Sequence, residues 1–374
     1  MRFTQLRRLL FQLHMWIGLL LGLFLAALGL SGSAIVYDQE IAAFLNPPPA
    51  VVAHGDLLSL DTLAQAARKA MGSQGQVQIT LPVTAETPVV ARVSAPPRDN
   101  AVRDGTRGPG QGSQLYLDPV SGAVLDRRSS PLPAILAFAH QLHGNFLMGR
   151  DGRTQVVGWL GVAMCILGLS GLVLWWPRRG QWKYAFGVRR TAKGLRFHRE
   201  LHAAVGIWVF AVFMAVSFSG VVLAWPQLFG MPGPGQQAGG TPPAVAASGQ
   251  RVSADAALKL ALDAVPGAIP RSISLPARAG QPVSVALFSH GAVAATVLVD
   301  PYKAQVISVR DPFANWAAWQ RPVHQGLLGP VWRFLLFLSG LVPALFVTTG
   351  VVMWWKKYRV HIPMTVPLAE EAAS

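Results

Sequence analysis

Four stretches of the sequence are long, apolar and uncharged enough to cross a lipid bilayer, and they constrain the fold more than any other feature. A membrane-spanning helix needs about 20 consecutive apolar residues, and these stretches comprise residues 13–37, 155–176, 201–225 and 334–355. Charged residues make up only 13% of the chain, against roughly 25% in a soluble domain. The sequence therefore predicts a membrane protein. Its first span is too long for a cleaved signal peptide and is expected to be a signal anchor.

Basic residues gather in the short segments on one side of these spans. Three precede the first span, eight lie in the loop 177–199, and three follow the last span. Because Lys and Arg in short flanks mark the cytoplasmic side of a membrane, we expect both termini in the cytoplasm. Much of the net charge of +15 is thereby a topology signal, and we expect no nucleic-acid partner.

The two halves of the chain resemble each other, which predicts an internal duplication. Placing His14 on His202 aligns 13–32 with 201–220 without a gap. With a slightly smaller difference in residue number between the two halves, three further features match: His143 with His324, Gly171 with Gly350, and Trp175-Trp176 with Trp354-Trp355. Each half then consists of a span, an outer segment and a second span.

The two outer segments share three local motifs. Each has a Ser-x-Asp helix start, an Ile-x-Leu-Pro strand and an Asp-Pro turn before a last strand; the motifs begin at Ser59 and Ser253, Ile79 and Ile273, and Asp118 and Asp300. This pattern resembles the PepSY domain. Together with the paired-histidine spans, the chain over about residues 5–358 resembles the PepSY-associated transmembrane family. Within that family it is similar to the haem-containing, ferrioxamine-type siderophore reductases of the bacterial inner membrane.

The expected fold is a membrane protein with a four-helix transmembrane bundle, built by internal duplication, and two small α+β PepSY-like periplasmic domains. The expected segments are a cytoplasmic N-terminus with the first span (1–37), a first PepSY-like domain (38–131), an interfacial helix with the second span (132–176), a basic cytoplasmic loop (177–199), the third span (200–225), a linker with the second PepSY-like domain (226–313), an interfacial segment with the fourth span (314–355), and a cytoplasmic tail (356–374).

Six of the nine histidines cluster where the spans meet water. Polar groups inside a membrane are costly and usually functional, and four of these histidines recur at matching positions. His14 and His202 lie near the cytoplasmic side, whereas His143 and His324 lie near the outer side. Neutral imidazole is a strong axial ligand for haem iron, and helix bundles build such sites from facing helices. The sequence therefore predicts two b-type haems, one held by each pair.

Several other residues are secondary candidates for cofactor binding. His198 stands one helical turn before His202, and His140 one turn before His143, so either member of each couple is a possible ligand. Four arginines near the outer pair are candidates for haem propionates or an anionic ligand, and equally for lipid headgroups: Arg150, Arg153, Arg321 and Arg333. The remaining histidines are expected to be ordinary surface residues: His54, His290 and His361.

Other chemistries fit the sequence less well. The single Cys165 excludes an intrachain disulfide and a two-thiol haem attachment. The segment from His198 to His202 has its Glu in the third position, whereas a zincin requires it in the second. The glycines within 108–112 lack the βαβ context of a nicotinamide site. We expect no acid–base catalyst, and the electron donor is expected to be a membrane quinol or a cytoplasmic reductase.

The expected function is a membrane reductase. The histidine positions predict transmembrane electron transfer, and the family resemblance implies a ferric siderophore as the substrate outside. Two alternatives remain open. The first is a non-enzymatic PepSY-type module that binds a peptide or inhibits a protease, which predicts no visible cofactor. The second is a transporter, because internal repeats are common in that class, although the spans here are apolar at mid-depth.

Overall fold

Four long helices form a bundle in the computed structural model, which describes residues 3–51, 55–82, 87–94, 113–129, 132–231, 244–289 and 292–359. They are α1 (Phe3–Val36), α6 (Gly158–Trp175), α7 (Gly194–Ala224) and α10 (Pro330–Arg359). Among the described residues, four helical segments are long and apolar enough to span a membrane: Gln5–Val36, Arg153–Trp175, Gly194–Ala224 and Pro330–Lys357. The prediction of a membrane protein is thus confirmed. His54, His290, His361 and much of the expected linker lie outside the described residues.

Helices α1 and α7 occupy opposite corners of the bundle. Among the four long helices, α1 packs on α10 and α6, and α7 packs on the same two helices. The contact between α1 and α10 is very close, since a Cβ on Gly29 would overlap the carbonyl oxygen of Gly340. Side chains of α1 and α7 that point inward therefore face each other across the core.

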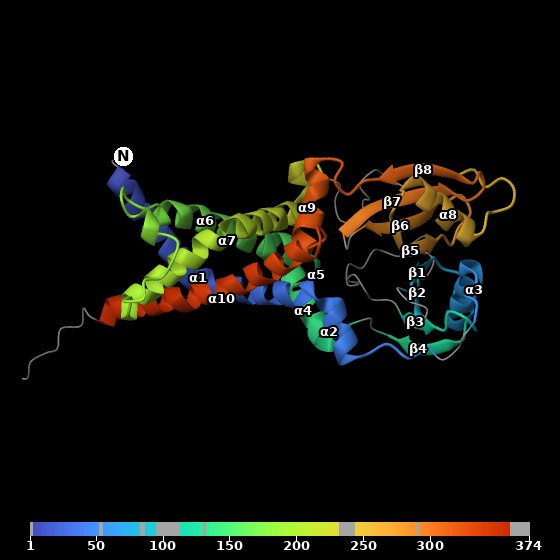
Figure 1. The fold of residues 1–374 in the computed structure, drawn as a ribbon, viewed down its shortest axis with the longest axis horizontal. Coiled ribbons are helices and arrows are strands. Elements are labelled where there is room, and N and C mark those ends of the chain that lie inside the picture. Colours follow the sequence, from blue (N-terminus) through green and yellow to red (C-terminus); the bar gives the residue numbers. More distant parts are fainter. Residues whose placement is uncertain are drawn as a thin grey trace, which may run out of the picture.

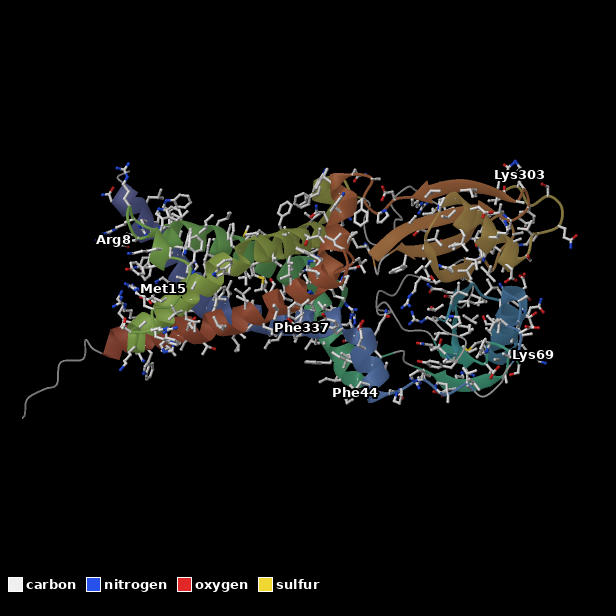
Figure 2. The ribbon with its side chains drawn as sticks, in the orientation of Figure 1. Arg8, Met15, Phe44, Lys69, Lys303 and Phe337 are labelled. Atoms are coloured by element: carbon white, nitrogen blue, oxygen red, sulfur yellow. The ribbon has the colours of Figure 1, made fainter. Side chains whose placement is uncertain are left out.

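Figure 1 shows a sheet at one end of the bundle, with the N-terminus, the α6–α7 connection and the end of α10 at the other end. Arg8 in Figure 2 lies at this second end. The three basic segments of the sequence therefore share one end of the bundle.

The basic loop between α6 and α7 is tied to α7 by a buried carboxylate. Glu200 accepts hydrogen bonds from the Arg189 backbone N–H at 2.9 Å, from Arg189 Nε at 2.8 Å and from Arg196 Nε at 2.9 Å. The loop also contains the 3₁₀ turn η2 (Trp182–Tyr184). Just after this turn, the carbonyl oxygen of Phe186 accepts a hydrogen bond from Trp208 Nε1 at 2.9 Å. These bonds give the loop a fixed shape beside the membrane-spanning helices.

Short helices occupy the junction between the bundle and the sheet. They are α2 (Asp38–Leu45), α4 (Ala134–Asn145), α5 (Gly149–Gly152), the π-helical turn η1 (Arg153–Val157), the 3₁₀ turn η3 (Pro226–Phe229) and α9 (Trp316–Gln325). Large apolar side chains of this layer are exposed, including Phe44, Phe138 and Trp316, and Figure 2 places Phe44 at the junction. Of these, Trp316 is of the type that is enriched at the interfacial region of a bilayer.

Within the described residues, the outer segments form one eight-stranded antiparallel sheet. Its strands are β1 (Val77–Thr80), β2 (Val89–Val93), β3 (Gln114–Leu117), β4 (Val124–Arg128), β5 (Ile269–Leu275), β6 (Val283–Ser289), β7 (Ala292–Asp300) and β8 (Gln305–Arg310). Their order is β4-β3-β2-β1-β5-β6-β7-β8, so β1 and β5 join the two segments at the centre, with Ile79 opposite Ile273. The structure thus merges the two expected domains into one sheet.

One helix from each segment packs on this sheet, and each helix caps the other. Helices α3 (Leu60–Met71) and α8 (Ala254–Ala264) share a core of apolar side chains with the sheet. Asp255 accepts a hydrogen bond from the Leu60 N–H at 3.1 Å, and Asp61 accepts one from the Ala254 N–H at 2.7 Å. Acceptors at a helix N-terminus satisfy N–H groups that have no partner within the helix. The repeated Ser-x-Asp motif is therefore a reciprocal link between the two segments.

Candidate functional site

The structure brings the four repeated histidines together as two facing pairs. His14 of α1 and His202 of α7 have ring centres 6.2 Å apart, with an angle of 73° between the ring planes. His143 of α4 and His324 of α9 have ring centres 5.9 Å apart, with an angle of 34°. All four residues are half-buried. Each pair thus joins one imidazole from the first half of the chain to one from the second.

Backbone carbonyls orient the outer pair. His143 Nδ1 lies 2.9 Å from the carbonyl oxygen of Leu28, and His324 Nδ1 lies 3.1 Å from that of Val216. A carbonyl only accepts, so both rings donate from Nδ1–H, which leaves the lone pair on Nε2. Burial lowers the pKa of His143, and burial together with the nearby His143 lowers the pKa of His324 to about 4. Both rings are therefore neutral at pH 7, the form that binds a metal.

Hydroxyl groups orient the inner pair in the same way. His14 Nδ1 lies 2.9 Å from Ser170 Oγ, and His202 Nδ1 lies 2.7 Å from Thr349 Oγ1. Ser170 donates its own proton to the carbonyl oxygen of Ile166 at 2.6 Å, and Thr349 donates to a carbonyl one turn earlier at 2.8 Å. Because each hydroxyl proton is already used, the hydroxyl oxygen accepts from the imidazole. The inner rings thus also donate from Nδ1 and keep a lone pair on Nε2.

The spacing of each pair fits a shared metal ion. A metal–imidazole bond of about 2.0 Å, with the ring centre about 1.1 Å behind the bonding nitrogen, puts two rings on opposite sides of one metal about 6.3 Å apart between centres. The observed 6.2 and 5.9 Å agree with this value. A second nitrogen that donates to a fixed acceptor is the usual support of a metal-binding histidine. The residues present therefore fit two iron sites with two imidazole ligands each, as in a b-type haem.

The two pairs lie at different heights in the bundle. His14 marks the inner pair on α1, and the same helix reaches the outer pair at Leu28 and Gly32, which contact His143. A helix rises about 1.5 Å per residue, so the distance along α1 between these two levels is roughly 21–27 Å. The hydrocarbon core of a bilayer is about 30 Å thick. The pairs therefore stand near opposite faces of one membrane.

Glycines make room for the outer rings. A Cβ on Gly32 would lie 2.8 Å from Cε1 of His143, and a Cβ on Gly220 would lie 3.0 Å from Cε1 of His324. Gly32 and Gly220 fall on each other in the same gapless alignment that matches His14 with His202. Only a residue without a side chain lets each helix approach its imidazole this closely.

The secondary histidines do not join these pairs. His140 Nε2 lies 2.9 Å from Asp38 Oδ2 and forms an ion pair with it whenever the ring is protonated. His198 is half-buried and its ring contacts that of the adjacent Phe197, with centres 5.6 Å apart. The pairs are therefore built from His202 and His143, the members of each couple that the repeat matches.

The candidate arginines fall into three groups. Arg333 binds the Glu40 carboxylate. Arg153 lies at the start of η1 and Arg321 lies in α9. Arg150 belongs to α5, and its side chain lies outside what the structure describes.

Four acceptors of the Nδ1–H groups were not foreseen from the sequence: Leu28, Ser170, Val216 and Thr349. The repeat contains the signal that would have found them. Leu28 falls on Val216 in the alignment of the first and third spans, and Ser170 falls on Thr349 in that of the second and fourth.

Comparison with known proteins identifies a family along nearly the whole chain. The family model described as PepSY-associated TM region matches residues 11–357. Among curated proteins, none matches the chain.

Proposed function

The chain belongs to the PepSY-associated transmembrane family, and from this membership and its two histidine pairs we propose that it is a di-haem membrane reductase. It would carry electrons across the bilayer and reduce a ferric siderophore, Fe(III) to Fe(II), on the side of the sheet. The observation that carries the proposal is the arrangement of the four imidazoles. Each donates from Nδ1 to a fixed acceptor, and the rings face each other in pairs at 6.2 and 5.9 Å.

Two b-type haems, held by His14 with His202 and by His143 with His324, would supply one-electron transfer between the two membrane faces. The protein contributes positions and proton states to this chemistry. The acceptors of the Nδ1–H groups hold each imidazole in one tautomer and one orientation. Gly32 and Gly220 let α1 and α7 approach the outer rings. No side chain is assigned an acid–base role.

The substrate class follows from the family resemblance and from the position of the outer pair. His143 and His324 lie on the junction helices α4 and α9, outside the four candidate spans. A bulky chelate on that side needs no deep pocket if electrons leave near the surface. One electron converts Fe(III) to Fe(II), and the lower charge weakens the attraction to the oxygen ligands of the chelate. The iron is thereby released.

We also propose that the chain arose by duplication and that its sheet consists of two PepSY-like units. The motifs of the two segments serve equivalent purposes, because Asp118 and Asp300 each accept two backbone N–H bonds in the turn before a last strand. The basic end of the bundle would face the cytoplasm of a bacterial cell, and the sheet would lie in the periplasm. Reporter fusions at Gly187 and Gly240 test this, and a periplasmic reporter active at Gly187 would reverse the orientation.

Haem content is the first test of the function. The purified full chain should contain two haems that acid–organic extraction removes. His14→Ala or His202→Ala should remove one haem, and His143→Ala should remove the other. His198→Ala, a change on α7 outside the pairs, is the matched control and should keep both. A colourless protein after expression with added haem would contradict the proposal and favour a non-enzymatic module or a transporter.

Activity is the second test. After reduction with dithionite under anaerobic conditions, the protein should be reoxidised when ferric siderophores are added, and Fe(II) should appear in a ferrous-specific trap. Stopped-flow spectra follow the reaction. His324→Ala should lose siderophore reduction while the inner site remains reducible. Absorption bands that stay reduced with several ferric chelates would refute the reductase and leave a haem-bearing carrier. The immediate electron donor is expected to be a membrane quinol or a cytoplasmic reductase. The same spectra identify it as the donor that reduces the oxidised protein.

A further inference from the structure

Helices α3 and α8 cover one face of the eight-stranded sheet. Val77 and Ile79 of β1 are fully buried in the core that the sheet shares with these helices. Successive side chains of a strand point to opposite faces, so Gln78 and Thr80 point away from the helices. Figure 1 shows α3 and α8 on the side of the sheet that is turned away from the bundle. The opposite face, called here the helix-free face, is therefore turned toward the bundle.

A series of contacts connects the sheet to the outer histidine pair. Arg271 of β5 donates from Nη2 to Gln39 Oε1 of α2 at 2.9 Å. The neighbouring Asp38 of α2 lies 2.9 Å from His140 Nε2 of α4. His143 follows His140 by about one turn of α4. Helix α2 thus joins the sheet to the helix that carries one member of the outer pair.

The two halves of the chain meet at equivalent residues in two places. Ile79 pairs with Ile273 at the centre of the sheet, and His143 faces His324 in the outer pair. Both pairings join residues that the repeat matches. If one twofold axis relates the halves, this axis passes through both places. The centre of the helix-free face then lies over the outer histidine pair.

Four polar side chains cross the centre of the helix-free face in a row. Arg92 of β2 lies opposite Gln78 of β1. Gln78 lies opposite Ser274 of β5, which in turn lies opposite Ser284 of β6. Each of the four stands between two buried residues of its own strand, so all four share one face. Adjacent strands are about 4.8 Å apart, which makes the row about 14 Å long.

The donors of this row are largely unused. Within the described residues, Gln78, Ser274 and Ser284 have no side-chain hydrogen bond, and Arg92 has only a long one, to Gln114 at 3.5 Å. Gln78 and Arg92 are also exposed. Amide, hydroxyl and guanidinium groups donate hydrogen bonds to oxygen atoms, and those from a guanidinium are charge-assisted. The row contains no carboxylate that would repel a negative charge.

We propose that Arg92, Gln78, Ser274 and Ser284 form the docking site of the ferric chelate. The occupant is a neutral or anionic chelate that presents the oxygen atoms around its metal to this row of donors. Its identity as a ferric chelate rests on the proposed function. The row holds the chelate between the sheet and the outer pair, on the side where electrons leave. It sets how tightly the chelate binds, whereas the histidine pairs set whether the chelate is reduced.

The first experiment measures binding without electron transfer. Gallium(III) replaces iron(III) because it has the same charge and nearly the same size but is not reduced. Gallium–desferrioxamine E, which is neutral, and gallium citrate, which is anionic, are titrated by calorimetry into the full chain in nanodiscs. Arg92→Gln with Gln78→Leu removes one charge-assisted donor and one neutral donor. We expect this variant to bind at least one of the two chelates about tenfold more weakly or worse.

The matched control makes the same two changes on the other side of the sheet. Arg127→Gln alters a residue opposite the core residue Leu115, and Gln65→Leu alters an exposed residue of α3. This control should bind both chelates as the parent does. Ser274→Ala removes a single hydroxyl and should weaken binding about 2–10-fold. Equal loss in the control would show an effect on folding, and an unchanged affinity in both row variants would place the chelate elsewhere. Both results, or a parent that binds neither chelate, overturn the proposal.

The second experiment separates docking from reduction. The dithionite-reduced parent and row variants are mixed with the ferric forms of the same chelates in a stopped-flow instrument. The row variants should need a higher chelate concentration for half-maximal reoxidation and should keep the limiting rate. A protein without haem whose gallium-chelate affinity still depends on the row would support the docking site and refute the reductase. A haem-containing protein that reduces the chelates equally well with and without the row would refute the docking site alone.

Discussion

Replacing Gly32 by alanine is expected to displace the His143 imidazole and disturb the outer pair without changing either histidine. The new Cβ would lie 2.8 Å from Cε1 and 3.0 Å from Nδ1 of that ring, whereas ordinary contact begins at 3.4 Å. The ring must therefore retreat by about 0.6 Å, or the helices must separate by a similar amount. The same ring is held by the Leu28 carbonyl oxygen at 2.9 Å. Its retreat lengthens that hydrogen bond and changes the direction of Nε2.

The expected energy follows from two opposing effects. Overpacking a well-packed site costs about 1–3 kcal/mol, whereas alanine in place of a helical glycine stabilises by roughly 0.5–1 kcal/mol. Gly144→Ala is the matched control, because Gly144 is next to His143 in α4 and a Cβ there meets nothing within 4 Å. The control receives the favourable effect alone. The free energies of unfolding of the two variants should thus differ by about 1–3 kcal/mol.

Denaturant unfolding in detergent and haem content measure the two consequences. Gly32→Ala should unfold more readily than Gly144→Ala. It should also hold the haem proposed at the outer pair less tightly, and leave the haem proposed at the inner pair unchanged. Gly220→Ala should show the same effects in weaker form, because its Cβ would lie 3.0 Å from His324. If Gly32→Ala matched Gly144→Ala in both measurements, His143 would not lie against α1 as described.

Three further changes test other contacts. Ser170→Ala removes the acceptor of His14 Nδ1–H and should weaken inner-site haem affinity about 10–100-fold; an unchanged affinity in a haem titration would show that the hydroxyl does not orient the ring. Glu200→Gln removes the carboxylate that binds two arginines of the basic loop. It should lower the free energy that holds this loop in place by about 1–3 kcal/mol, and trypsin should therefore cleave the loop faster. The hydrogen bond from Arg333 lowers the pKa of Glu40 below 4.5. The ionised Glu40 carboxylate therefore contributes fully to folding stability above pH 4.5, and this contribution is lost as the pH falls through the lowered pKa. Acid unfolding of Glu40→Gln should therefore be less pH-dependent than that of the parent below pH 4.5.

The membrane spans could be predicted from the sequence because lipid leaves little choice of structure. About 20 apolar residues without charge can satisfy their backbone in a bilayer only as a helix. The pairing of the histidines was also predictable, since the repeat put each at an equivalent depth on a different helix. The helix ends were less accurate. Helix α7 begins at Gly194, before the predicted start of the third span at residue 200, so His202 lies two turns inside the helix.

The joining of the outer segments could not be predicted from local patterns. Strands β1 and β5 belong to different halves of the sequence, and nothing in either strand indicates that the other is its partner. Each segment was therefore expected as a small separate domain. The reciprocal caps by Asp61 and Asp255 were equally hidden, because each acid appears in the sequence to cap its own helix. Long-range pairing of this kind depends on tertiary packing and not on propensity.

The histidine acceptors show what a repeat can reveal about a membrane protein. A hydroxyl group inside a span can donate its hydrogen bond to a backbone carbonyl one turn earlier. A single Ser or Thr in a span therefore does not by itself indicate another hydrogen-bond partner. Ser170 and Thr349 differ because both stand at the same position of the two halves, directly before Gly171 and Gly350. An unrelated pair of hydroxyls would have no reason to match in this way. Their agreement in depth with the two inner histidines points to a shared requirement, which the structure identifies as an acceptor for Nδ1–H.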